Sequence, residues 1–316
     1  MEIMYKKKGK SSYKSQFHRV NALRIILIFL AVALIAGIPL FIIAGIQNRK
    51  GIERRQLLRE WEAGAYDTVY ALSQDILADK PMDYFMLTIH GFSAYQLGIS
   101  QINNTDTLHY IDQCIWALRK AILLKEAATD GKVYYVLGKA YYYKGDDFSD
   151  LAIAYLEKAL ELSYDVSDIP EYLGLSYAAA GDYRSSVEAF SHALNPVDKE
   201  PSDKLLLAIA RSYKELEEYE TARAYLMRCL EISKDSNSLI KARLLLAEIY
   251  IRAGDFSEAE KLYLAIIESS GDNTEAYYQL GELYARKGDL TQARAYWRLS
   301  LRADPANQKA RARLSQ

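Results

Sequence analysis

A motif that recurs at intervals of about 34 residues constrains the fold of this chain more than any other feature of its sequence. Each copy has a Leu or Ile followed by Gly or Ala, and a Tyr four residues after the Leu or Ile. In the five copies, the Leu or Ile and its small neighbour are Leu137-Gly138, Leu173-Gly174, Ile209-Ala210, Leu246-Ala247 and Leu280-Gly281. The corresponding tyrosines are Tyr141, Tyr177, Tyr213, Tyr250 and Tyr284. Such a period is typical of solenoids, in which each repeat is one supersecondary unit that packs on its neighbours.

The order of residues within each copy predicts two antiparallel helices. A Gly or Ala after the Leu lets the second helix approach closely, and Leu and Tyr at helical spacing form one buried face. A pair such as Gly254-Asp255 ends the first helix in a left-handed conformation and caps the second. In the copy at 203–236 this pair is replaced by Glu217-Glu218, so we expect that turn to be less sharply specified.

The last copy carries the residues by which the family is identified. Tyr277, Leu280-Gly281, Tyr284, Ala293, Trp297 and Pro305 resemble the tetratricopeptide repeat (TPR) pattern of Trp, Leu-Gly, Tyr, Ala, Phe and Pro. The resemblance implies an all-α fold, a right-handed TPR α-solenoid of helix pairs. It implies five repeats over 131–307, a degenerate TPR-like helical region over 47–130 with helices at 83–98 and 108–125, and a C-terminal capping segment over 308–316.

The resemblance also implies a concave groove, lined by the first helix of each repeat, that binds peptides or proteins. The residues at the groove positions are Phe92, Tyr95, Tyr135, Lys139, Tyr142, Tyr143, Leu175, Ala178, Leu207, Arg211, Lys214, Glu248, Ile251, Arg252, Tyr278, Glu282 and Arg286. Aromatic and Arg side chains anchor many interfaces, so the stretch 135–143 is the first candidate for binding. The alternative is that this Tyr-rich stretch packs against a neighbouring repeat.

One known groove function is not expected. Chaperone adaptors of this family hold an acidic C-terminal peptide with Lys and Asn at set positions of the first helices. This chain has Tyr135, Lys139 and Tyr142 there, so the Asn is missing.

Residues 25–46 form an uncharged run of 22 residues, which as a helix spans the hydrocarbon core of about 30 Å. The run is longer than the apolar region of a cleaved signal peptide and ends in charged residues, so we predict a single transmembrane helix that acts as a signal anchor. Seven Lys and Arg precede it and five follow closely, which favours a cytoplasmic N-terminus.

Residues 1–24 are then a basic cytoplasmic arm, whose charges either only set the topology or also lie on anionic lipid. The repeat domain is expected outside the cytoplasm, in the periplasm of a bacterium, as part of a single-pass inner-membrane protein.

Composition argues against several classes of function. Residues 61–316 carry a net charge of about −10, the wrong sign for a nucleic-acid partner. The two cysteines, Cys114 and Cys229, are too few for a disulfide framework or a zinc site, and they occupy small-residue core positions that favour buried free thiols. No catalytic motif is present, so we expect no catalytic residue, no cofactor and no metal.

These observations predict a membrane-anchored TPR scaffold or adaptor that binds partner proteins at the membrane surface. The expected setting is an envelope-associated complex for biogenesis, secretion or a flagellar motor. The alternative is a structural subunit that self-associates through its solenoid within a large membrane-bound assembly, so a homo-oligomer is one of the expected partners. An enzyme is the least supported class.

Overall fold

The computed structural model describes residues 54–194 and 201–315, which form helices, turns and loops but no strand. The chain divides into two compact units, Met1–Asp75 and Ile76–Gln316. The described part of the first unit has a helix over 54–62 and the start of α2 (Tyr66–Asp79). In it the Trp61 ring packs edge-on against Tyr66, with centroids 4.9 Å apart.

The predicted arm (1–24) and transmembrane helix (25–46) lie outside the described residues. Among the helices that the structure describes, none has the length and apolar character needed to cross a bilayer.

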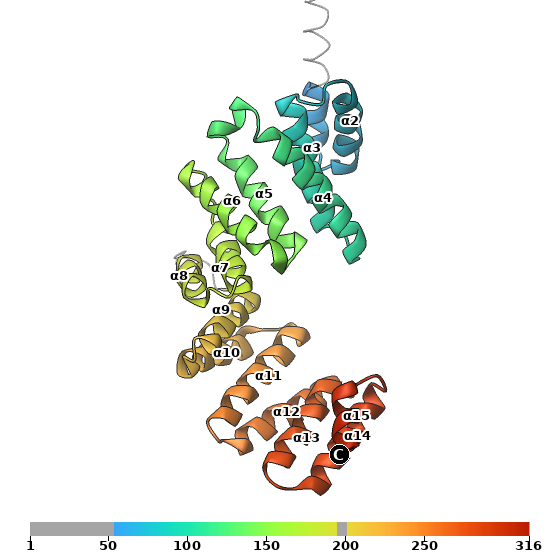
Figure 1. Ribbon diagram of the computed structural model, residues 1–316, viewed down its shortest axis with the longest axis vertical. Helices are drawn as coiled ribbons and strands as arrows, with labels where there is room; N and C mark the ends of the chain where they lie inside the picture. Colours follow the sequence, from blue (N-terminus) through green and yellow to red (C-terminus); the bar gives the residue numbers. More distant parts are fainter. Residues whose placement is uncertain (1–53, 195–200, 316) are drawn as a thin grey trace, which may run out of the picture. The chain divides into compact units, whose positions relative to one another are not determined.

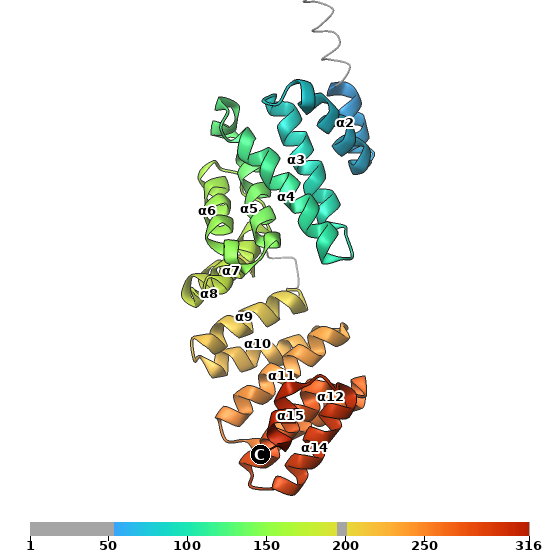
Figure 2. The same cartoon turned by 45° about the vertical axis from the view of Figure 1, so that its right-hand side comes forward.

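The second unit is a solenoid of helix pairs, in which each pair packs on the next (Figures 1 and 2). The pairs are α3 (Tyr84–Ile99) with α4 (Asn104–Ala121), α5 (Gly131–Lys144) with α6 (Ser149–Glu161), α7 (Ile169–Ala179) with α8 (Tyr183–Ala193), α9 (Asp203–Glu215) with α10 (Tyr219–Ile232), α11 (Ser236–Arg252) with α12 (Phe256–Ser270), and α13 (Thr274–Arg286) with α14 (Leu290–Ala303). Two short 3-10 helices, η1 (Lys125–Thr129) and η2 (Asp146–Phe148), precede α5 and α6, and α15 (Gln308–Leu314) ends the chain. The expected all-α solenoid of helix pairs is confirmed.

The glycines of the motif lie where the two helices of a pair touch. A Cβ atom on Gly138 of α5 would lie 2.7 Å from Cγ of Leu156 on α6, closer than two carbons can approach without a shift. A Cβ atom on Gly91 of α3 would likewise lie 2.7 Å from Cγ of Leu118 on α4. The pair α3 and α4, which the sequence marks only weakly, therefore packs through the same contact as the regular repeats.

The turns inside the pairs follow the Gly-Asp pattern. Gly254 has φ of 79°, and a side-chain oxygen of Asp255 accepts a backbone hydrogen bond at the start of α12. Glu217 adopts the same left-handed conformation, with φ of 61°, but Glu218 makes no side-chain capping bond. The backbone amides of Asp255 and Glu218 donate to the carbonyl five residues earlier, at 2.8 and 2.9 Å. The replacement of Gly-Asp thus removes the cap and leaves the backbone path unchanged.

The predicted boundaries of α4 were wrong. A helix was expected over 108–125, after a long turn, whereas α4 begins at Asn104 and ends at Ala121. The reason is the cap: Oδ1 of Asn103 accepts a hydrogen bond of 2.8 Å from the backbone amide of Asp106, which starts the helix early. Helix α3 runs from Tyr84 to Ile99, one residue later than the predicted 83–98.

Helix α15 covers the apolar end of the last pair. Its Ala310 is fully buried and packs in one cluster with Ala293 and Trp297 of α14. Asn307 caps the helix by accepting a hydrogen bond of 3.2 Å from the backbone amide of Ala310. A terminal helix of this kind keeps the last repeat from exposing its packing face.

Candidate functional site

The groove positions named from the sequence all lie on the first helices of the pairs, on α3, α5, α7, α9, α11 and α13. The structure separates them into several groups. Those on α3 and α5, apart from Tyr142, belong mostly to a packed network between repeats, and Tyr278 and Glu282 contact α15. Leu207 is buried in the core with residues of α10 and α11. The others, from Tyr142 to Arg286, line two hollows.

The packed group is centred on Lys139, whose exposed fraction is only 8%. Its Nζ donates hydrogen bonds of 2.8 Å to Oδ2 of Asp168 and 3.0 Å to the hydroxyl of Tyr135. The Tyr135 hydroxyl in turn donates to Asp168 at 2.9 Å. A buried ammonium group is tolerated only when paired in this way. Asp168 precedes α7, so the three side chains join one repeat to the next.

Tyrosine rings enclose the same ammonium group. Nζ of Lys139 lies 4.2 Å from the ring centroid of Tyr172 and 5.7 Å from that of Tyr95, distances at which a cation is attracted to an aromatic face. Tyr143 shares a hydrogen bond of 3.1 Å between its hydroxyl and that of Tyr172. We call Tyr95, Tyr135, Lys139, Tyr143, Asp168 and Tyr172 the tyrosine network.

The tyrosine network is built for packing. Burial raises the pKa of Tyr95, Tyr135 and Tyr172 above the ordinary value of tyrosine, so all three stay protonated. The hydroxyl of Tyr95 is buried and has no hydrogen-bond partner among the described residues. Of the two interpretations of the stretch 135–143, packing between repeats describes Tyr135 and Lys139. Tyr142 remains half-buried and faces a hollow.

The first hollow has a volume of about 560 Å³ and lies between α5, α7, α9 and α11. Its lining includes Tyr142, Leu175, Ala178, Arg211, Lys214 and Leu245. Arg211 is exposed, and its guanidinium group makes no hydrogen bond or ion pair with any residue that the structure describes. This middle hollow therefore combines apolar and charged side chains, and one of its cations, Arg211, has no partner among the described residues.

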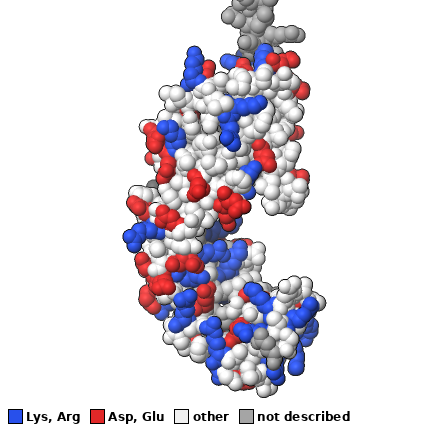
Figure 3. Space-filling model, viewed as in Figure 1, with Lys and Arg blue, Asp and Glu red and all other residues white. Residues whose placement is uncertain are grey.

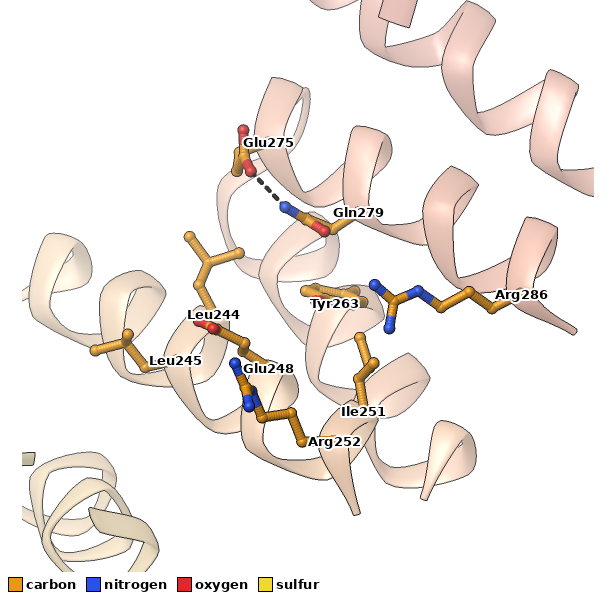
Figure 4. A pocket seen from close by; sticks show the side chains of 9 residues that line it. All are labelled: Leu244, Leu245, Glu248, Ile251, Arg252, Tyr263, Glu275, Gln279 and Arg286. Carbon is orange, nitrogen blue, oxygen red and sulfur yellow. Dashed lines mark hydrogen bonds between the residues drawn. The ribbon is translucent and has the colours of Figure 1, made fainter. Parts of the chain in front are cut away.

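The second hollow has a volume of about 440 Å³ and lies between α11, α12 and α13 (Figure 4). It is lined by Leu244, Leu245, Glu248, Ile251, Arg252, Tyr263, Glu275, Gln279 and Arg286. Arg286 is exposed and its side chain extends toward Tyr263 and Ile251, without an ion pair to any described residue. Leu245 lines both this distal hollow and the middle hollow, so the two are neighbours on the first-helix face.

The other charges of the groove are held by neighbours. Nζ of Lys214 donates to both carboxylate oxygens of Glu248, at 3.0 and 3.2 Å. Arg252 donates a hydrogen bond of 2.9 Å to the hydroxyl of Tyr219, which lies on the second helix α10. The Glu248 carboxylate offsets the charge of Lys214, whereas the neutral Tyr219 hydroxyl only positions Arg252.

Two predicted groove residues are covered by the chain itself. Glu282 forms an ion pair with Arg313 of α15, with a hydrogen bond of 2.8 Å from Nε. Nζ of Lys309 lies 5.8 Å from the ring centroid of Tyr278. Phe92, at the other end of the set, has Nζ of Lys132 at 4.9 Å from its ring centroid. The open part of the groove thus runs from Tyr142 to Arg286.

Sequence reasoning missed several residues that shape these sites. Asp168 lies in the loop before α7, where no periodic pattern points to it, and Tyr219 lies on a second helix. Glu275 and Gln279 share a hydrogen bond of 2.8 Å and are four residues apart on α13. Their helical spacing from Glu282 and Arg286 was the signal that could have found them.

Two other kinds of site, metal centres and reactive thiols, depend on clustered ligands and on thiols with a low pKa. None of the His, Cys, Asp and Glu side chains that the structure describes gather in a group of three that could hold a metal ion. Cys114 and Cys229 are buried free thiols, as expected from their core positions, and burial raises the pKa of each, to about 11 for Cys229. A thiol with a raised pKa is a poor nucleophile.

Comparison with known families agrees with this geometry. One model described as tetratricopeptide repeat matches residues 135–203 and 244–308, and a second one with the same description matches residues 201–270. Residues 135–308 are tetratricopeptide repeats. TPR proteins mediate protein–protein interactions and bind partner proteins or peptides, and the TPR fold is typically non-catalytic. A comparison with curated proteins found no match.

Solved structures show the same TPR fold at low sequence identity. The C-terminal part of a TPR repeat-containing protein from Cytophaga hutchinsonii is 18% identical, with a TM-score of 0.58 over 83% of this chain and 99% of that one. PilW, a type IV pilus biogenesis factor, is 18% identical, with a TM-score of 0.56 over 70% and 97% of the two chains. PilF of Pseudomonas aeruginosa is 15% identical, with a TM-score of 0.51 over 70% and 95%.

Proposed function

We propose that this chain is a membrane-anchored scaffold whose TPR groove binds a segment of a partner protein. The observation that carries the proposal is the groove between Tyr142 and Arg286. It joins two hollows of about 560 and 440 Å³ through Leu245, and it presents Arg211 and Arg286, neither paired with a described residue. Both hollows combine apolar side chains with charged ones, and Tyr and Arg, which line each of them, are enriched in protein interfaces.

The anchor and the location belong to the proposal as well. They are supported by the uncharged run over 25–46 and by the excess of Lys and Arg before it. The N-terminus is then cytoplasmic, and the repeats are extracytoplasmic, in an envelope-associated complex for biogenesis, secretion or a flagellar motor. PilW is described as a pilus biogenesis factor, and its likeness in fold is compatible with such a setting without selecting it.

Topology is tested by protease protection. In intact cells or in spheroplasts with an intact inner membrane, added protease should reach the repeats once the outer barrier is opened. Digestion that requires lysis of the inner membrane would place the repeats in the cytoplasm and contradict the proposed orientation.

Partner capture is tested by crosslinking in membranes, pull-down of the full chain and mass spectrometry. The test variant is R211A/R286A, because both side chains are exposed and contribute little to the fold. The matched control is R184A/R228A, which removes two exposed arginines from the second helices α8 and α10. We expect the groove variant to recover at least tenfold less partner than the control. Equal recovery by both variants would refute groove binding.

Tyrosine substitutions need more care. Tyr135 and Tyr143 hold other side chains of the tyrosine network, so their replacement by Ala would weaken the fold as well as the groove. Tyr142→Ala is the cleaner probe because this side chain lines the middle hollow and makes no hydrogen bond to a described residue. We expect it to lower partner capture while the helical circular dichroism signal is kept.

A further inference from the structure

The C-terminal end of the chain differs in charge from the residues 61–285 that precede it. Residues 286–316 contain eight Lys and Arg but only two acids, Asp289 and Asp304, which gives a net charge of +6. Residues 61–285 contain 20 Lys and Arg against 36 Asp and Glu, a net charge of −16. On the face shown in Figure 3, Lys and Arg gather over the C-terminal helices, whereas Asp and Glu are frequent over α6–α10.

Three of these cations form a row on one helix. Arg294, Arg298 and Arg302 follow each other at intervals of four residues on α14, and all three are exposed. We call them the arginine stripe. Arg294 and Arg298 make no ion pair or hydrogen bond with any described residue, and Arg302 only approaches Asp272, at 3.9 Å.

The fold itself does not explain the arginine stripe. Like charges four residues apart repel each other and destabilise a helix. Other cations of the same region do serve the fold: Lys287 pairs with Glu260 at 2.6 Å, and Arg313 pairs with Glu282. Leu290, one helical turn before the stripe, is 56% exposed and would add an apolar contact to an interface on this side of α14.

An unexplained acidic feature lies in the turn between α9 and α10. Glu217 stands where other repeats have Gly, and it keeps the left-handed φ of 61° that a side chain disfavours. Neither Glu217 nor Glu218 has a side-chain partner among the described residues, and Glu218 makes no capping bond. We call Glu217 and Glu218 the acidic turn. Glu217 thus keeps a strained backbone conformation, although no described residue pairs with either carboxylate of the turn.

We propose that the arginine stripe docks onto the acidic turn of a second copy of this chain. Each copy carries both surfaces, so complementary charge is available from the chain itself. The stripe consists of Arg alone, whose planar guanidinium group matches a carboxylate with two parallel hydrogen bonds. Arg is also enriched in protein interfaces, whereas Lys is depleted. An anionic lipid surface is disfavoured, because it would repel the acidic remainder of the chain.

The two surfaces are different, so the contact is head to tail. Such a contact continues to rings or open chains instead of stopping at a dimer. The proposal is independent of the partner that the groove binds, because neither the stripe nor the turn lines a hollow.

The test is sedimentation equilibrium of the full chain in a non-ionic detergent, at low and high salt. For the wild type we expect a mean mass that rises past the dimer with concentration and falls toward the monomer in 0.5 M NaCl. The variant R294E/R298E should associate at least tenfold more weakly. The control R184E/R228E makes the same charge change on α8 and α10 and should associate like the wild type.

A charge exchange makes the test specific. The variant E217K/E218K should also fail to associate alone. A mixture of E217K/E218K with R294E/R298E should recover association, because the intact stripe of the first variant meets the intact turn of the second, and the reversed charges of the two variants also match. A wild type that is monomeric at every concentration would overturn the proposal. So would association that R294E/R298E leaves unchanged, or variants that weaken association singly but show no recovery in the mixture.

Discussion

The ion pair between Lys139 and Asp168 gives a prediction whose size can be worked out from the structure. In Asp168→Ala, the ammonium group of Lys139 would stay 8% exposed but lose its carboxylate, and the hydroxyl of Tyr135 would lose its acceptor. Removing one partner of a buried pair costs about 3–5 kcal/mol. The Asp168 side chain is 36% exposed, so water offsets part of this cost. We expect Asp168→Ala to lower the free energy of unfolding by about 2–3 kcal/mol.

The loss should be local, because stability in a repeat array is set mainly by each repeat and its neighbours. Hydrogen exchange read by mass spectrometry measures it in α5 and α7 separately from α13 and α14. In the double variant Lys139→Met with Asp168→Ala no buried charge remains, so this variant should be more stable than Asp168→Ala alone. A loss below about 0.5 kcal/mol for Asp168→Ala would refute the reasoning. So would a double variant whose loss of stability equals the sum of the losses of Lys139→Met and Asp168→Ala.

Three further predictions concern stability. Gly138→Leu should destabilise the α5–α6 pair by about 1–3 kcal/mol or more, since a side chain there meets Leu156, and thermal unfolding by circular dichroism measures it. Glu217→Gly should stabilise the chain by about 0.5–1 kcal/mol in urea titration, because it relieves a positive φ, and an unchanged midpoint would contradict this. The hydrogen bond from Lys287 lowers the pKa of Glu260. The charged Glu260 therefore contributes its full stabilisation above pH 4.5, its pKa in the unfolded chain, and loses it as pH falls through the lower pKa of the folded state. The free energy of unfolding of Glu260→Gln should depend less on pH in that range.

The regular part of the fold was predictable from sequence because its contacts repeat. The Gly of each Leu-Gly pair marks a place where only a small residue fits. A residue of the second helix packs against that place, as Phe190 does against Gly174. The early start of α4 was not predicted, since the capping role of Asn103 depends on a short turn that the periodic pattern does not encode.

The candidate site was predictable only in part, for a physical reason. Helical periodicity identifies which side chains share the first-helix face, and two of the residues named in this way, Arg211 and Arg286, line the hollows. It does not say which of them find partners in the next repeat. Lys139 and Asp168 are 29 residues apart and meet only because a loop of irregular structure returns to α5. Whether a groove residue is free or occupied is therefore a property of packing between repeats.

The contacts of α15 with Tyr278 and Glu282 also bear on the length of segment that the proposed groove could hold. Both side chains lie on α13, the helix of Arg286, and side chains of α15 already contact them. If the groove binds a segment as proposed, α15 limits the open surface, and the segment is expected to lie between α5 and α13. A chain with one more helix pair inserted before α15 would accept a longer segment, without any change in the residues that contact it.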